Sequence, residues 1–283
     1  APPEYFYRYD QSSLPMPKLY GKDERPDHPY LRDYREAFAY DDHFRTEADV
    51  RRALAGYMGL CTFIDDQVGH ILSSLEAAGL SDSTRVVYTS DHGDNLGARG
   101  LWGKSNMYEE AVGVPLIVSG GGVAAGAVNE QPRSLIDLSR FILEATGCDA
   151  EGFGEHDLLS DEDGIVLSEY HATGSRSGAF MLRMGRWKYV YYAKYAPQLF
   201  DLETDPEELT DLAQDPDFAE ALDACHAALF AKVDAAAAHD RAIADQQSRI
   251  DSFGGADKII ARGDFGFSPP PGVTATFAKS EDA

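Results

Sequence analysis

Hydrophobic spacing along the chain changes from irregular to helical within the first fifty residues. Residues 1–45 are rich in proline, tyrosine and charge and show no sustained period, which predicts mainly extended loop. From Thr46 onward apolar side chains recur at steps of three or four, which predicts a long helix that ends near Gly79 and buries one face. Asp49, three places after Thr46, completes a capping-box pattern. The apolar stripe comprises Val50, Leu54, Tyr57, Cys61, Ile64, Val68, Ile71 and Leu75.

Three short apolar runs follow, and each has the composition of a strand covered on both faces in a parallel sheet. They lie at 85–90, 115–118 and 164–167, and a helix is predicted between the last two, at about 135–145. Helices that alternate with buried strands are typical of an open α/β sheet. The predicted fold class is therefore α/β, with part of a mostly parallel central sheet flanked by helices.

The pattern changes again after Ser175, where short strand-like runs follow one another closely. A Gly185-Arg186 turn and a turn near Pro197 separate these runs, which predicts a small antiparallel meander. The runs are 179–183, 187–192 and 198–202.

The C-terminal part is predicted to be helical and then extended. An alanine-rich segment from Asp217 to about Ser248 indicates a helix, and the last 30 residues have the composition of an extended tail or packing arm. We therefore expect two domains, an α/β part at 1–174 and a C-terminal subdomain at 175–283.

The charge balance restricts the partners of the chain. Asp and Glu number 48 against 25 Lys and Arg, a formal charge of −23 that argues against nucleic acid or an anionic membrane as a partner. No apolar run approaches the length of about 18 residues needed to span a membrane, so we expect a soluble protein. Three widely spaced cysteines favour a reducing compartment, the cytoplasm. A periplasmic location remains the alternative, because a signal peptide can be removed from a longer precursor.

The most informative polar motif is Asp91-His92-Gly93, directly after the run at 85–90. Open α/β sheets gather their ligand sites at the carboxyl ends of strands, where this motif is predicted to lie. Adjacent Asp and His side chains reach one divalent cation only if the backbone turns sharply, which Gly93 permits. From the spacing alone, a polar turn without a metal is an equally good interpretation.

A glycine-rich segment follows and carries Lys104, thirteen residues after Asp91. Its glycines allow the loop to fold back, so that the lysine ammonium returns to the predicted metal ligands. In so acidic a chain, a lysine beside a metal site is suited to holding an anionic oxygen. The alternative is a solvated loop lysine.

These residues carry a resemblance to a known family. The stretch from Tyr57 to Val118, which includes V-V-Y-T-S-D-H-G-D-N-L-G-A-R-G-L-W-G-K-S-N-M-Y-E-E and V-P-L-I-V, resembles the sulfatases of the alkaline phosphatase superfamily. It is most similar to the choline-sulfatase and phosphonate-monoester-hydrolase branches. R-W-K-Y at 186–189 and L-F-D-L-E-T-D-P-E-E at 199–208 are similar to the C-terminal signature of the family. The resemblance spans roughly residues 1–215.

The resemblance implies roles for several side chains. Asp91 and His92 would be ligands of one divalent metal ion, Ca²⁺ or Mn²⁺, and Lys104 would bind a non-bridging oxygen of the ester. Arg99 has no firm role in the family and is interpreted as a charge on the rim of the substrate site. His171 is a candidate substrate contact, although a loop histidine without a role is the favoured alternative.

Asp65 and Asp66 in the long helix also fit the family pattern. No ligand role is assigned to them, and packing or capping is the expected role of both.

Several elements of a complete sulfatase are absent from the sequence. The family nucleophile is a formylglycine made from Cys or Ser in C/S-x-P-S-R, and none of the three cysteines begins that pattern. Ser13-Leu14-Pro15 starts like the serine form but has Pro17 where arginine is required. The N-terminal Asp-Asp metal pair and the Pro-His element are also absent. We therefore expect a C-terminal fragment that is inactive alone, whose partners are the missing N-terminal half and further copies of itself.

The expected activity of the parent enzyme is hydrolysis of a small sulfate monoester. A field of charge −23 disfavours polyanionic substrates, so a zwitterionic ester such as choline sulfate is favoured over a sulfated glycan. The first alternative is a phosphonate or phosphate ester hydrolase of the same superfamily. The second is a non-catalytic half that acts only as a scaffold.

Overall fold

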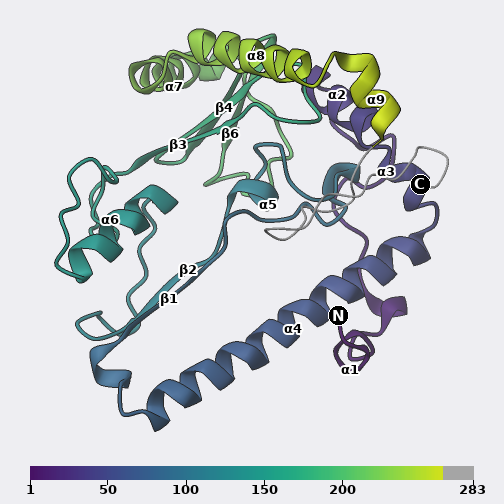
Figure 1. The fold of residues 1–283 in the computed structure, drawn as a ribbon. Coiled ribbons are helices and arrows are strands. Elements are labelled where there is room, and N and C mark those ends of the chain that lie inside the picture. Colours follow the sequence, from purple (N-terminus) through teal and green to yellow (C-terminus); the bar gives the residue numbers. More distant parts are fainter. Residues whose placement is uncertain (264–283) are drawn as a thin grey trace. The chain divides into compact units, whose positions relative to one another are not determined.

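The computed structural model describes residues 1–263 (Figure 1). These residues divide into two compact units between Lys232 and Val233. The first unit contains all the strands that the described residues form. In chain order it consists of α1 (Pro3–Phe6), α2 (Pro29–Ala37), α3 (Tyr40–His43), α4 (Glu47–Ala77), β1 (Arg85–Thr89), α5 (Glu109–Val112), β2 (Leu116–Gly120), α6 (Leu135–Ala145), β3 (Ile165–Tyr170), β4 (Ala179–Met184), β5 (Trp187–Tyr192), β6 (Tyr195–Asp201) and α7 (Ala219–Lys232), with short 3₁₀ turns between some of them.

The helix α2 lies within the segment predicted to be extended loop, so that prediction is wrong there. His28 caps the helix by accepting the Tyr30 amide at Nδ1, and Pro29 occupies the first helical position. Tyr30, Leu31 and Tyr34 are buried on one side of the helix. A nine-residue helix is too short to show a sustained period and depends on such packing for its stability.

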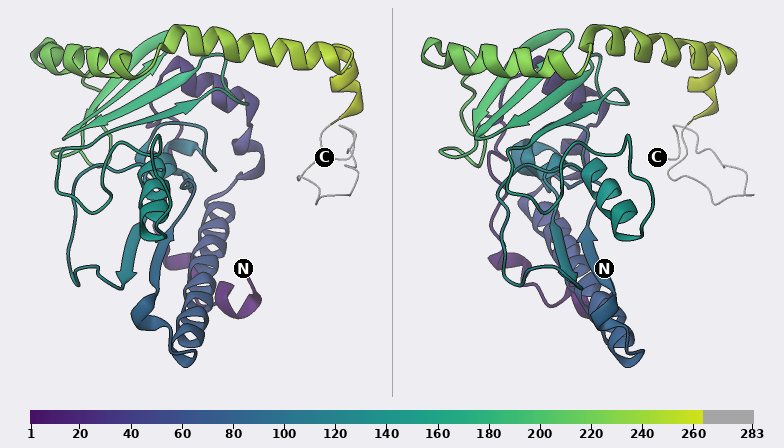
Figure 2. Two further views of the ribbon diagram at one scale, coloured as in Figure 1. Left: turned by 60° about the vertical axis from the view of Figure 1, so that its left-hand side comes forward. Right: turned by 90° about the vertical axis from the view of Figure 1, so that its left-hand side faces the viewer.

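The long helix α4 confirms the prediction from hydrophobic spacing, including the capping box of Thr46 and Asp49. Among residues 1–263, its predicted apolar face is fully covered only near the N-terminal end, where Val50 and Leu54 are buried. Toward the C-terminal end the same face is open, and Ile71 is 65% exposed. Figure 2 shows the helix extending beside the β1–β2 ribbon.

β1 and β2 form an antiparallel pair, with Val87 opposite Val118. The prediction that these runs are parallel strands of one sheet with 164–167 is therefore wrong. A continuous apolar run indicates cover on both faces but carries no information about strand direction. Within residues 1–263 the β1–β2 pair is covered only in part. Helix α6 packs against Val87 and Val118, whereas Ile117 is 60% exposed.

The C-terminal strands form a four-stranded antiparallel sheet in the order β3-β4-β5-β6, which confirms the predicted meander. β3 contains most of the run at 164–167 and pairs with β4, so this sheet crosses the expected domain boundary at 174/175. The last turn lies at residues 193–194 rather than near Pro197, which stands inside β6 close to an irregularity in its pairing.

This sheet packs against α2 and against the segment at 101–108. Helix α7 packs against β4 and β5. The main hydrophobic core, which joins α2 to the sheet, includes Tyr30, Leu31, Tyr34, Leu101, Met107, Tyr108, Met181, Val190, Tyr192 and Phe200.

The second unit contains α8 (Ala235–Ser252) and α9 (Ala256–Arg262). The helix predicted over 217–248 is therefore two helices, α7 and α8, and α9 falls within the predicted tail. The rest of that predicted tail, from residue 264, lies outside the described residues. Among residues 1–263, no helix has both the length and the apolar character needed to cross a membrane.

Candidate functional site

The predicted metal motif lies in a sharp turn directly after β1. The His92 amide donates to Asp91 Oδ1 at 3.0 Å, which folds the aspartate side chain back over the turn. Gly93 donates its amide to the carbonyl of Ala111 in α5 at 2.9 Å. A Cβ on Gly93 would lie 2.0 Å from the carbonyl oxygen of Glu110, so only glycine allows this approach.

The hydrogen bonds of His92 determine its tautomer. Nδ1 lies 2.8 Å from the carbonyl oxygen of Gly93, which can only accept, so Nδ1 carries the proton. Nε2 is left with a lone pair, and the Lys104 ammonium donates to it at 2.5 Å. Asp91 Oδ2 lies 3.4 Å from the same nitrogen. The three residues singled out in the sequence therefore converge on one point.

These donor atoms suit a divalent cation. A neutral imidazole whose Nδ1–H is held by a backbone carbonyl is the usual form of a metal-ligating histidine. Although partial desolvation raises the pKa of Asp91, His92 and the nearby hydrogen bonds outweigh it, and the pKa lies below its ordinary value. No group of three or more His, Cys, Asp or Glu side chains suited to a metal occurs among residues 1–263. These residues thus offer two ligands of a metal site, and ligation by them stays a prediction.

The loop that presents Lys104 is closed by hydrogen bonds across its base. Asn95 donates from its amide and its side chain to the carbonyl of Gly103, at 2.7 and 2.6 Å. The Gly103 amide in turn donates to Asp94 Oδ1 at 3.1 Å. These bonds bring the two ends of the segment together, so that Lys104 returns to His92.

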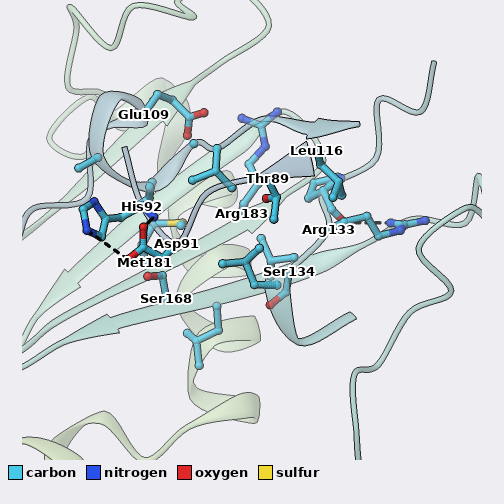
Figure 3. A pocket seen from close by; sticks show the side chains of 18 of the residues that line it. Thr89, Asp91, His92, Glu109, Leu116, Arg133, Ser134, Ser168, Met181 and Arg183 are labelled. Carbon is cyan, nitrogen blue, oxygen red and sulfur yellow. Dashed lines mark hydrogen bonds and ion pairs between the residues drawn. The ribbon is translucent and has the colours of Figure 1, made fainter. Parts of the chain in front are cut away.

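A cavity of about 420 Å³ opens beside Asp91 and His92, between the β1–β2 pair and the sheet formed by β3 and β4 (Figure 3). Glu109, Arg133 and Arg183 supply charged side chains to its lining. The guanidinium of Arg133 donates to several backbone carbonyls, among them that of Asp157 at 3.0 Å. Sequence reasoning did not single out these residues, although Glu109 lies within the Y-E-E stretch.

The chain is similar to known proteins in both sequence and structure. The family described as sulfatase matches residues 17–148. A choline-sulfatase of Rhizobium meliloti (strain 1021) is 37% identical over 186 residues, which is 62% of this chain and 36% of that protein. Residues 17–148 thus have the sequence of a sulfatase-family segment. Arylsulfatase K of Mus musculus is 34% identical over 197 residues, 63% of this chain and 36% of that protein.

Solved structures show the same relationship. The chain is similar to the phosphonate monoester hydrolase SpPMH from Silicibacter pomeroyi, with a TM-score of 0.71, 28% identity, and coverage of 82% of this chain and 52% of that one. The phosphonate monoester hydrolase of Agrobacterium radiobacter is 23% identical, with a TM-score of 0.63. This similarity covers 82% of this chain and 53% of that one, and it supports the fold. The chain thus spans about a third of the curated relatives and about half of these solved structures.

The interpretation of Arg99 as a rim charge is wrong. Its side chain is fully buried, with Nη1 3.0 Å from a carboxylate oxygen of Glu110. Nη2 donates to the carbonyl of Glu207 at 2.6 Å, and the guanidinium lies 3.8 Å from the centre of the Tyr108 ring. The carboxylate and the carbonyl compensate for the loss of water, which is what allows an arginine to be buried.

The other candidates lie away from the cavity. His171 Nε2 is 3.1 Å from a carboxylate oxygen of Glu169, and its ring packs edge-on to Phe180. His171 is not among the residues that line the cavity, and its role as a substrate contact stays a prediction. Asp66 accepts a hydrogen bond from Tyr5 at 2.8 Å, which joins α1 to α4 and confirms a packing role.

Proposed function

We propose that the chain is the C-terminal part of a sulfatase that hydrolyses a small sulfate monoester. The observation that carries this proposal is the convergence of Asp91, His92 and Lys104 at the end of β1. Family membership supports the sulfatase assignment, and coverage of 36% of the choline-sulfatase supports a partial enzyme. The formylglycine nucleophile would then belong to the part of the enzyme outside this sequence.

Each of the three residues has a separate task in this proposal. Asp91 and His92 would hold the metal ion, Ca²⁺ or Mn²⁺, through a carboxylate oxygen and Nε2. The bound cation would neutralise negative charge on the sulfate group. Gly93 keeps His92 in the tautomer that can bind, because its carbonyl retains the proton on Nδ1. Lys104 would donate to a non-bridging oxygen of the ester, on which charge develops in the transition state.

The substrate we favour is a small ester with a cationic group. A net charge of −23 repels polyanions and attracts the cationic end of a zwitterion. The name of the choline-sulfatase relative is consistent with that chemistry. A phosphonate ester is the second candidate, because similarity to SpPMH extends over 82% of this chain.

Parallel turnover assays on the complete enzyme test this proposal. We expect choline sulfate and an aryl sulfate to have a higher kcat/KM than an aryl phosphonate. Asp91→Asn should reduce both metal content and activity, whereas the matched change Asp65→Asn, at an exposed acid on α4, should alter neither. Faster turnover of the phosphonate would favour the second candidate. Absence of turnover, with no formylglycine in the mass spectrum, would favour a non-catalytic scaffold.

We also propose that the rest of the enzyme covers the open face of α4 and the β1–β2 pair. Within residues 1–263, each of these two strands is paired on one edge only. Large apolar side chains gather on the same elements: Tyr57, Leu60, Ile64, Ile71, Leu72, Tyr88, Leu116 and Ile117 are all exposed. Unpaired strand edges and exposed apolar faces favour association with other chains. They therefore support binding of this chain both to the missing half of the enzyme and to further copies of itself.

A further inference from the structure

The C-terminal signature contains a buried ion pair that the proposed chemistry does not use. Lys188 on β5 and Glu208 both have fully buried side chains, with Nζ 2.7 Å from Glu208 Oε1. The same ammonium lies 2.9 Å from Oε1 of Glu109, the first residue of α5. Burying such charges is costly unless each is paired, so their presence calls for a structural or functional reason.

The turn that carries Glu208 is held by several hydrogen bonds. The Asp201 carboxylate binds the guanidinium of Arg186, and the Asp205 amide donates to the Asp201 carbonyl at 2.7 Å. Asp205 accepts the amide of Thr210 at 2.8 Å. Glu208 has a φ of 54°, in the left-handed region that non-glycine residues rarely adopt. The turn therefore fixes the direction of one carboxylate at a cost in backbone strain.

A first line of contacts leads from this carboxylate to the metal motif. Glu208 Oε2 accepts the backbone amide of Glu109 at 2.7 Å, which holds the start of α5. At the other end of α5, the carbonyl of Ala111 accepts the amide of Gly93 at 2.9 Å. The absence of a side chain on Gly93 lets α5 lie directly against the Asp91–His92 turn.

A second line of contacts leads to the loop of Lys104. Arg99, which belongs to that loop, donates to the carbonyls of Glu207 and Glu208 at 2.6 and 3.2 Å. It also binds Glu110 of α5 at 3.0 Å. The same signature turn thus contacts both segments that bring Lys104 to His92.

From these contacts we propose that Lys188 and Glu208 are positioning residues, which hold α5 against Gly93 and thereby set the geometry of Asp91, His92 and Lys104. The proposal rests on the proposed function in one respect: the geometry of Asp91, His92 and Lys104 matters because these residues would bind the metal ion and the ester. The contacts themselves are independent of which ester is hydrolysed.

Hydrogen–deuterium exchange on the full 283-residue chain tests the proposal. Lys188→Met combined with Glu208→Met removes both charges together, which avoids a lone buried charge and should preserve the fold. We expect the Gly93 amide to exchange about tenfold faster or more, together with amides of the 95–104 loop, while amides of β4 keep their rates. Glu208→Gln, whose side-chain oxygen can still accept from Glu109, should keep the Gly93 rate within about threefold of the original.

Two control variants separate positioning from general loss of stability. Glu203→Gln changes an exposed acid of the same turn that pairs with Arg186, and should leave Gly93 unchanged. Leu229→Ala opens the packing of α7 and should affect β4 and β5 rather than Gly93. Unchanged exchange at Gly93 in the double variant, or equal acceleration there and in β4, would overturn the proposal. Because no substrate is used, a wrong assignment of the ester leaves this result unaffected.

Discussion

Hydrogen bonds at the base of its loop hold the Lys104 side chain close to His92. Its ammonium donates to His92 Nε2, and the backbone beside it is tied to Asp94 and Asn95. In the complete enzyme Lys104→Ala should lower kcat/KM by about 10²–10³, the usual effect of losing one donor to transition-state charge. Steady-state kinetics and metal analysis check this prediction, and metal content should change little. Lys194→Ala, at an exposed turn, is the control. If both variants had the same kcat/KM, Lys104 would have no role in hydrolysis.

Single residues differ in how far the sequence could predict their roles. The sequence predicted that Asp91, His92 and Lys104 lie close together, because a strand end, a tight turn and a flexible loop are all local features. Arg99 was misassigned because its burial depends on Glu207 and Glu110, and Glu207 lies 108 residues further along the chain. A single sequence shows no such distant contact.

At the level of elements, hydrophobic spacing predicted every strand of the described fold but not how the strands pair. The run at 164–167 joined the second sheet, and β1 paired with β2 in the antiparallel direction. Pairing depends on the partners available in space, while composition reports only how well a strand is covered. The helix α2 was missed because its stability comes from contacts with the sheet rather than from its own nine residues.

The turn after β6 gives a prediction about pH. The Arg186 guanidinium beside Asp201 lowers the pKa of that carboxyl to about 2, against about 3.9 in an unfolded chain. Because the folded state binds this proton less readily, the stabilisation is complete above about pH 4 and is lost as the pH falls toward 2. The free energy of unfolding should therefore fall more steeply between pH 4 and pH 2 in the original chain than in Asp201→Asn. Urea titrations at several pH values measure both slopes.

A suitable control for that experiment is Asp23→Asn, which changes an exposed acid for which the structure shows no salt bridge among the described residues. It should keep the slope of the original chain. Parallel curves for the original chain and Asp201→Asn would contradict the role of the Arg186–Asp201 pair.

At the scale of the whole molecule, the open face of α4 should govern the behaviour of the isolated chain. We expect no hydrolysis of sulfate esters by this chain with Ca²⁺ or Mn²⁺, and a light-scattering mass above 30.9 kDa. Ile64→Glu combined with Ile71→Glu should shift the mass toward that of the monomer, because charge on an apolar face opposes association. Val128→Glu, at a highly exposed loop position, should not. Turnover by a verified monomer would contradict the partial-enzyme proposal.

The position of Cys61 on the open face of α4 makes coverage of that face chemically measurable. Its thiol is exposed, as is that of Cys148, whereas Cys225 is buried. A maleimide reagent should therefore modify Cys61 readily when the chain is monomeric, as in the variant that combines Ile64→Glu with Ile71→Glu, with Cys148 as an internal reference in the same sample. When the rest of the enzyme or a second copy covers α4, labelling of Cys61 should slow while that of Cys148 continues. The ratio of the two labelled peptides in a mass spectrum then records, over time, how a naturally occurring thiol is shielded as the enzyme assembles.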